Sequence, residues 1–411
     1  MTTTSLDSLD FAELQTLYTV FVSSGATRTS ISNEAHYSIV KTTNTVNALE
    51  RKGLILNAGK TRTNGGRPSY VYRTSPDMGY SVGMSVWHDR VHIVLVNGTG
   101  EVELEQSRSY TLPVDSASHA SEIVERIVEA FEGLKRSQGK GKRLISLGLS
   151  LPGMVDSKNG VWLQGLQVTG ISRFRIAEKL SERLQVPTYA EDIARTLAFR
   201  AMRMAPTSSA EHFVVLYLGS GIGSGIVINH RIYSGVHGLS GEIGHIEHVN
   251  NDYRCSCNNV GCLETVLSVD GIQRLFRDRL RQGVRSSLQR QFRSAELSLE
   301  SILDAAGRGD RFTLMTLAEI GTFIGDSCAM IIKLYNPAYV VVSGPLSLFR
   351  EFYAESVNRV IEQKVLPEML VGYETLFADY QPSDEAHGAA LNALDRVFVD
   401  RLQSAQESRQ S

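Results

Sequence analysis

Residues 241–264 contain Gly241-Glu242-Ile243-Gly244-His245, then Cys255-Ser256-Cys257, and then Cys262-Leu263-Glu264. His245 and three cysteines therefore fall within eighteen residues, and the cysteines have the spacing C-x-C-x4-C. Closed tetrahedral zinc sites use such thiolate and imidazole ligands, so the pattern predicts one structural Zn2+ per chain. The predicted ligands are His245, Cys255, Cys257 and Cys262. The alternatives are a chance cluster of reduced thiols, or a different histidine ligand, since His237 and His248 lie nearby.

Two weaker patterns precede this stretch. Residues 219–225 read Gly-Ser-Gly-Ile-Gly-Ser-Gly between predicted strands at 213–218 and 225–228. Such glycines can expose backbone N–H groups to a phosphate or another polar ligand, although tight hairpins also collect glycines. Asp192 follows another predicted strand and precedes a helical stretch at 194–205. It could orient a sugar hydroxyl, act as its general base, or cap the helix.

Strands and helices alternate around these patterns, which predicts an α/β body. The last amphipathic helix, residues 383–402, has Ala386, Ala390, Leu394 and Val397 on one side. That side is expected either to pack in the body or to contact the N-terminal region and carry a signal. Beyond it we expect a polar C-terminal tail, residues 401–411.

The net charge of -2 conceals an uneven distribution. Residues 25–75 contain eight basic and two acidic side chains, so this segment carries +6 and the rest of the 411-residue chain about -8. A uniformly basic nucleic-acid coat is excluded, whereas a local basic module is not. Four cysteines are too few for a disulfide scaffold, and Cys328, alone in an apolar helix, is expected in the core. With no apolar run of ~18 residues, we expect a cytoplasmic, nucleoid-associated protein without membrane insertion.

The basic segment has the order of a winged helix-turn-helix. Apolar spacing predicts helices at 11–21 and 38–52, with a weaker one at 30–36, and strands follow at 54–56 and 69–73. Short polar side chains on an exposed helix suit base edges in the major groove, and an arginine that follows two glycines, as in Gly65-Gly66-Arg67-Pro68, suits a narrow minor groove. The predicted DNA contacts are Ser38, Lys41, Thr43, Asn44, Asn47, Gly66 and Arg67. The alternative is a small helical domain with a solvated basic face.

Taken together, residues 219–264 and the segment around Asn336-Pro337 resemble the ROK family of repressors, open reading frames and kinases. The resemblance implies an actin-like ATPase (ribonuclease H-like) body in two lobes at 77–400, with the zinc loop at 245–262, behind a winged helix at 1–76. It implies the same four zinc ligands. It also implies sugar contacts at Gly153, Asp192, Glu242, His245 and Glu264, and Asp192 corresponds to the catalytic base of the family's kinases.

The chain departs from the kinase pattern at the phosphate loop. Family kinases have Asp-x-Gly-Gly-Thr after the first strand, where this chain has Ser85-Val86-Trp87-His88-Asp89. Glu191 stands where the kinases have an asparagine. Phosphoryl transfer depends on positioning the phosphates, so we expect no catalytic activity and regard Asp192 as a vestigial base.

The resulting hypothesis is a DNA-binding repressor of carbohydrate uptake or metabolism genes. Its expected partners are double-stranded operator DNA and a sugar, a sugar phosphate or a sugar-transporter subunit, and it would act as a homodimer or homotetramer. The alternative is an ATP-dependent ROK sugar kinase with a regulatory DNA-binding domain.

Overall fold

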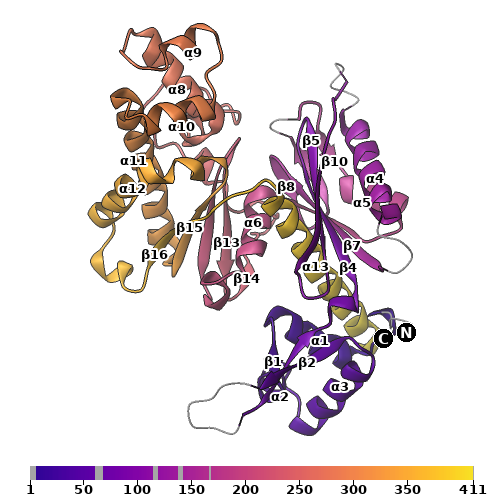
Figure 1. Ribbon diagram of the computed structural model, residues 1–411. Coiled ribbons are helices and arrows are strands. Elements are labelled where there is room, and N and C mark those ends of the chain that lie inside the picture. The colour runs from indigo at the N-terminus through magenta and orange to yellow at the C-terminus, as the bar shows by residue number, and fades with distance from the viewer. Residues whose placement is uncertain (1–5, 61–67, 114–118, 138–141, 166–167, 411) are drawn as a thin grey trace.

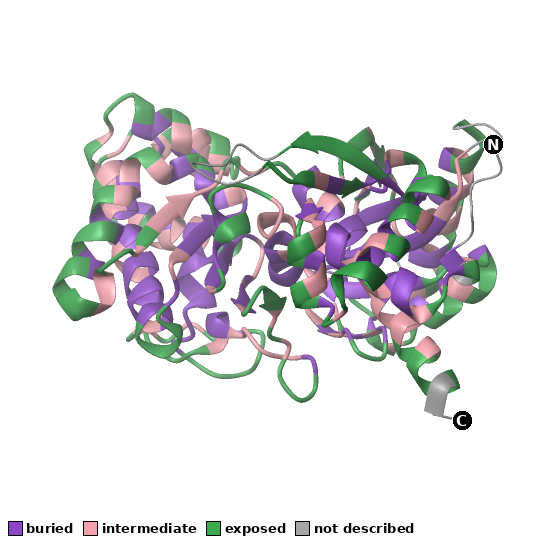
Figure 2. Ribbon diagram, turned by 90° about the horizontal axis from the view of Figure 1, so that it is seen from below, coloured by how far each residue is buried: buried purple, intermediate pink, exposed green. Residues whose placement is uncertain are grey.

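The computed structural model describes residues 6–60, 68–113, 119–137, 142–165 and 168–410. It consists of an N-terminal helical unit with a small sheet and of two lobes, each built on a five-stranded sheet (Figure 1). Buried residues fill the interior of both lobes, whereas exposed residues lie at the periphery (Figure 2). This arrangement confirms the predicted α/β fold class.

The N-terminal unit is a winged helix-turn-helix. Its helices are α1 (Phe11–Val22), α2 (Arg28–Glu34) and α3 (Ile39–Arg51). Its sheet has the order β1-β3-β2, with β1 at Ala26–Thr27, β3 at Tyr70–Thr74 and β2 at Ile55–Lys60. The wing between β2 and β3, with the predicted contacts Gly66 and Arg67, lies outside the described residues.

Side-chain caps fix where these helices begin. Asp10, Thr27 and Ser38 each accept a hydrogen bond from a backbone N–H of the first helical turn, which has no partner inside the helix. The cap at Ser38 confirms the predicted start of α3. That helix buries Thr42, Thr45, Val46 and Leu49 and leaves its opposite face exposed.

The first lobe contains a sheet of order β11-β7-β4-β5-β6. Its strands are β4 (Tyr80–Val86), β5 (Arg90–Val96), β6 (Val102–Ser109), β7 (Leu144–Leu151) and β11 (Thr188–Asp192). The helices α4 (His119–Ser137) and α5 (Ile176–Leu184) pack on it, and a small sheet joins β8 (Met154–Asp156), β9 (Val161–Gln164) and β10 (Ser172–Phe174). Since β7 and β11 are parallel with Asp192 paired to Leu151, the loop after β7 lies beside Asp192.

The second lobe contains a sheet of order β14-β13-β12-β15-β16. Its strands are β12 (Phe213–Leu218), β13 (Ile222–Ile228), β14 (Arg231–Ile232), β15 (Tyr339–Ser343) and β16 (Glu374–Phe377). Its helices are α7 (Glu264–Leu267), α8 (Val269–Arg281), α9 (Gln289–Arg293), α10 (Leu299–Gly307), α11 (Arg311–Tyr335) and α12 (Arg350–Lys364). Among the described helices, α11 alone is long and apolar enough to cross a membrane, but it is mostly buried in this lobe.

Two helices connect the three parts. Helix α6 (Ile193–Ala201) packs on β12 and β13 of the second lobe and against α13 (Ser383–Gln410), which covers β4 and β7 of the first lobe. The approach of α13 is so close that a Cβ at Gly83 or Gly148 would lie under 2 Å from a carbonyl oxygen of the helix. Only glycine permits this packing.

The structure corrects the predicted C-terminal boundary. Residues 401–410 continue α13 as a helix and do not form a separate tail. The first half of α13 buries Ala386 and Ala390 against the first sheet. Its second half places Leu394, Val397 and Phe398 in the core of the winged helix, which follows the expectation of an N-terminal contact.

Candidate ligand, metal and DNA sites

The four predicted metal ligands converge on one point. The ligand atoms of His245, Cys255, Cys257 and Cys262 all lie within 4.8 Å of one another. The sulfurs of Cys257 and Cys262 are 3.6 Å apart, and Nδ1 of His245 is 3.4 Å from the sulfur of Cys255. Tetrahedral zinc with Zn–S bonds of about 2.3 Å requires ligand separations of about 3.5–4 Å. The donor set and its spacing therefore fit zinc.

The two alternative histidine ligands, His248 and His237, lie outside the group of four converging residues. Nε2 of His248 lies 2.9 Å from the carboxylate of Asp326 on α11, and this carboxylate also binds Lys364. His237 is not part of the cluster. The loop that carries the cysteines is closed by a hydrogen bond from the Cys255 N–H to the Asn259 carbonyl, 2.8 Å long. Of the three histidines, His245 is therefore the one placed together with the cysteines.

The five predicted sugar contacts line a single cavity at the junction of the lobes. Gly153 follows β7, Asp192 ends β11, and Glu242, His245 and Glu264 come from the zinc loop and its flanks. The cavity has a volume of about 60 Å3, and no lysine or arginine is among its lining residues. Ligand cavities usually measure ~300 Å3 or more, so this arrangement is narrower than a sugar requires.

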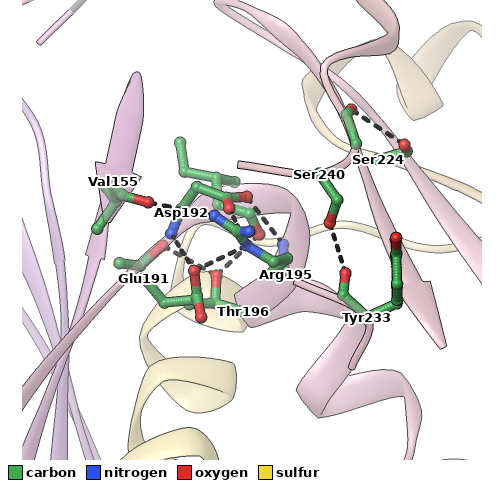
Figure 3. Close-up of polar contacts among 11 residues, drawn as sticks. Val155, Glu191, Asp192, Arg195, Thr196, Ser224, Tyr233 and Ser240 are labelled. Carbon is green, nitrogen blue, oxygen red and sulfur yellow. Dashed lines mark hydrogen bonds and ion pairs between the residues drawn. The ribbon is translucent and has the colours of Figure 1, made fainter. Parts of the chain in front are cut away.

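A buried arginine that sequence analysis missed holds Asp192 (Figure 3). Arg195 is 1% exposed, forms an ion pair with Asp192, and has its Nε 2.8 Å from Oε1 of Glu191. The other carboxylate oxygen of Asp192 accepts the Arg195 backbone N–H at 3.0 Å. Asp192 is therefore both the helix cap of α6 and a member of a buried ion network. The spacing of three residues between Asp192 and Arg195 on a predicted helix could have indicated this ion pair.

Two glutamates at or beside the cavity, Glu242 and Glu191, have raised pKa values. Burial raises the pKa of Glu242 to about 7, and the neighbouring Asp192 carboxylate adds to the effect. Burial also raises the pKa of Glu191 to about 7, against the opposing influence of Arg195. Carboxylates so placed accept hydrogen bonds from hydroxyl groups of a ligand.

The glycine-rich segment is mostly strand. Gly223 and Gly225 lie within β13, which begins at Ile222 and not at residue 225 as predicted. A Cβ at Gly225 would lie 2.4 Å from the Ala194 carbonyl oxygen, so this glycine allows α6 to approach the sheet. Ser220 and Gly221 remain in the turn and line the same cavity as Asp192.

Side chains occupy the place that corresponds to the kinase phosphate loop. The fully buried carboxylate of Glu385, in the first turn of α13, accepts hydrogen bonds from the Ser85 hydroxyl, from Trp87 Nε1 at 3.2 Å and from the Tyr380 hydroxyl at 2.6 Å. Trp87 and Tyr380 also line a larger cavity of about 660 Å3. Sequence analysis singled out Ser85 and Trp87 but missed Glu385, which lies 300 residues away.

The predicted DNA contacts at the start of α3 and along it lie in one region. Some of their side chains are exposed, and others already form hydrogen bonds within the protein. Lys41 and Asn44 are exposed, and the Lys41 ammonium lies 3.6 Å from the centre of the Tyr37 ring. Asn47 accepts a hydrogen bond from Arg28 of α2 at 2.8 Å. Two other side chains are used within the helix, since the Ser38 hydroxyl caps it and the Thr43 hydroxyl donates to the Ile39 carbonyl.

Known proteins share this architecture. A xylose repressor of Caldicellulosiruptor bescii is 24% identical over 86% of this chain and 87% of its own length. A glucokinase of Halalkalibacterium halodurans is 27% identical over 71% of this chain and 88% of its own length. The crystal structure of a ROK family transcriptional regulator, a homologue of the Escherichia coli Mlc protein, matches with a TM-score of 0.78 at 22% identity and covers 95% of this chain and 98% of that one. The ROK family model matches residues 82–396, well over half of the sequence, and the chain therefore belongs to the ROK family.

Proposed function

We propose that this protein is a DNA-binding transcriptional repressor of carbohydrate genes, released from its operator by a sugar. The observation that carries the proposal is a continuous packed connection from the sugar cavity to the winged helix. Relatives named as repressors and the basic charge of residues 25–75 support it.

The connection runs along α6. This helix begins at Asp192 in the cavity, and Arg203 follows its other end. Arg203 donates a 2.6 Å hydrogen bond to the Phe21 carbonyl at the end of α1 and lies 4.0 Å from the centre of the Phe21 ring. A movement at the cavity end of α6 would therefore reach the DNA-binding unit directly.

The chemical groups that line the cavity suit a neutral sugar. Asp192, Glu242 and Glu264 supply carboxylates that accept hydrogen bonds from hydroxyl groups, while Arg195 is engaged with Glu191 and Asp192. A phosphate group would meet these carboxylates without a lining lysine or arginine to compensate its charge. A neutral monosaccharide is thus favoured over a sugar phosphate, and a transporter subunit would act at another surface.

Ligand entry requires the lobes to separate, because the present cavity is too narrow for a sugar. A ligand shifts an equilibrium only through its different affinity for the two arrangements. A sugar that binds the wider arrangement would therefore change the placement of α6 and, through Arg203, of the winged helix. The operator would then be bound less tightly.

Zinc would be held by His245, Cys255, Cys257 and Cys262, where it supplies a structural crosslink. His245 would bind through Nδ1, since its Nε2 lies on the other side of the ring, 3.8 Å from Glu242. The crosslink would keep Glu242, His245 and Glu264 in position to receive the sugar.

Operator binding would involve a symmetric oligomer, a homodimer or a homotetramer, in which two winged helices meet the two halves of a palindromic site. Such a protein would work in the cytoplasm, on the nucleoid.

A sugar kinase is the less supported alternative. The family includes kinases, and Asp192 occupies the position of their base. Against it, Ser85, Trp87 and Glu385 fill the region of the phosphate loop, and Arg195 binds the Asp192 carboxylate.

Two assays test the proposal on the full-length protein. A gel-shift assay with the DNA upstream of its own gene should show specific binding that a neutral monosaccharide weakens. A coupled assay with ATP and common hexoses should show no sugar-dependent turnover. Clear turnover, or the absence of any specific DNA binding at or below physiological salt, would contradict the proposed function.

A further inference from the structure

Helix α3 carries an exposed apolar residue on its polar face. Val40, Asn44, Asn47 and Arg51 follow one another at intervals of four, three and four residues, which places them on one side of the helix. This side is opposite the buried residues Thr42, Val46 and Leu49, and Val40 is 67% exposed.

The position of Val40 distinguishes it from an ordinary exposed apolar residue. It is the second residue of the second helix of a helix-turn-helix, and the N-terminal residues of this helix are those that reach base edges in the major groove. Ile39 beside it is 51% exposed. The surrounding segment, residues 25–75, carries +6, which complements the charge of a DNA backbone.

The polar residues of this face are not equally free. The side-chain oxygen of Asn47 accepts a hydrogen bond from Arg28 at 2.8 Å, so one of its two acceptor positions is already used. Asn44, one turn after Val40, is exposed. Val40 is thus the exposed apolar residue on this side of the helix, with Asn44 as its nearest polar neighbour on the same side, whereas the exposed Ile39 lies on an adjacent side.

We propose that Val40 determines operator specificity by packing its methyl groups against the C5-methyl group of a thymine in the major groove. Thymine is the one base that presents a methyl group there, and apolar side chains recognise it by contact. The inference rests on the proposed repressor function. It identifies Val40 as a residue by which that repressor would recognise its operator sequence.

The test uses the full-length protein and an operator half-site located by footprinting on its own upstream DNA. Each thymine of the site is replaced in turn by deoxyuridine, which removes only the methyl group, and the dissociation constant is measured by fluorescence anisotropy. We expect one substitution in each half-site to weaken binding about 3–5-fold, the cost of losing one buried methyl contact. V40A should weaken binding to the natural operator by a similar factor and show no further loss on that substituted duplex.

Val102 on β6 provides a matched control, since it is a valine that is 44% exposed and lies outside the winged helix. V102A should leave both affinities unchanged. Specific binding that is insensitive to every deoxyuridine substitution, or a loss in V40A that is equal on all duplexes, would overturn the inference alone. The absence of any specific binding would overturn the repressor function as well.

Discussion

Two buried cysteines have different surroundings. Cys262 and Cys328 are both fully buried, but Cys262 lies 3.6 Å from another thiol, whereas Cys328 stands in the apolar core of the second lobe. Burial alone raises the pKa of Cys328 to about 12, which keeps it a neutral thiol. A metal converts neighbouring thiols to thiolates, so the cluster and the isolated residue should respond differently to substitution.

Substitution of Cys262 by serine should therefore abolish zinc binding. We expect the metal content of the purified protein to fall from about one zinc per chain to near zero, with a lower melting temperature, because a structural zinc contributes directly to folding. Elemental analysis and thermal unfolding measure both effects. C328A should retain the zinc, and full zinc occupancy in C262S would show that this thiol is not a ligand.

Glu385 predicts a pH dependence of stability. Burial raises its pKa from 4.5 to about 7, despite the hydrogen bonds donated by Ser85, Tyr380 and Trp87. A carboxyl group with a raised pKa stabilises the fold fully below pH 4.5, and this contribution is lost as the pH rises through about 7. The pKa difference corresponds to about 3 kcal/mol.

We expect E385Q to lose this dependence. Between pH 5 and pH 8 the free energy of unfolding of the natural protein should fall relative to E385Q by up to about 3 kcal/mol, as measured by urea denaturation at each pH. The exposed Glu355 supplies the control variant E355Q, which should follow the natural protein. Parallel curves for the natural protein and E385Q would mean that Glu385 is ionised throughout this range.

At the level of secondary-structure elements, α6 connects the cavity with the winged helix, and Arg203, just after α6, makes the direct contact with α1. The partly exposed Arg203 donates a hydrogen bond to the Phe21 carbonyl, and its guanidinium lies 3.2 Å from the Ser24 hydroxyl. A hydrogen bond from a charged donor contributes about 1.5–3 kcal/mol. This is the size of typical coupling free energies between two binding sites.

R203M should uncouple the two sites, since methionine keeps apolar bulk and loses both hydrogen bonds. We expect the factor by which sugar weakens DNA binding to shrink at least fivefold, while DNA binding without sugar is largely retained. Anisotropy titrations with and without sugar provide the measurement, and R308M, at an exposed position after α10, is the control. An unchanged sugar effect in R203M would exclude this route.

Helix α13 should make the winged helix and the body unfold together. Leu394 is fully buried in the core that this helix shares with α1, so L394A is expected to cost about 2–5 kcal/mol and to retain a single unfolding transition. Thermal unfolding followed by circular dichroism tests this. L366A, at a position that is 65% exposed, should change stability by less than about 0.5 kcal/mol. A separate early transition for the winged helix would contradict the shared core.

The helices, strands and metal-ligand spacing could be predicted from local sequence patterns. The contacts between residues far apart in the sequence could not. The apolar period of residues 11–21, the Ser38 cap and the spacing of the cysteines each act within a few residues, and the structure bears them out. The pairs Ser85–Glu385 and Arg203–Phe21 join residues about 180 to 300 positions apart, for which a single sequence offers no period or spacing. The polar composition of residues 401–410 hid a helix, because only one side of it packs.

In the whole molecule, the basic winged helix and the acidic two-lobed body pack together through α6 and α13. The cavity lined by Asp192, Glu242 and Glu264 lies where the two lobes meet, and α6 and α13 both extend from that junction toward the winged helix (Figure 1). We propose that sugar and operator favour different arrangements of this unit. Linkage then requires each ligand to weaken the binding of the other by the same factor.

Calorimetric titration of sugar into the full-length protein, free and saturated with operator DNA, tests this claim most directly. We expect the operator to weaken sugar binding by about 5–150-fold, and the sugar to weaken operator binding by the same factor. Equal sugar affinity in the presence and absence of operator would contradict it.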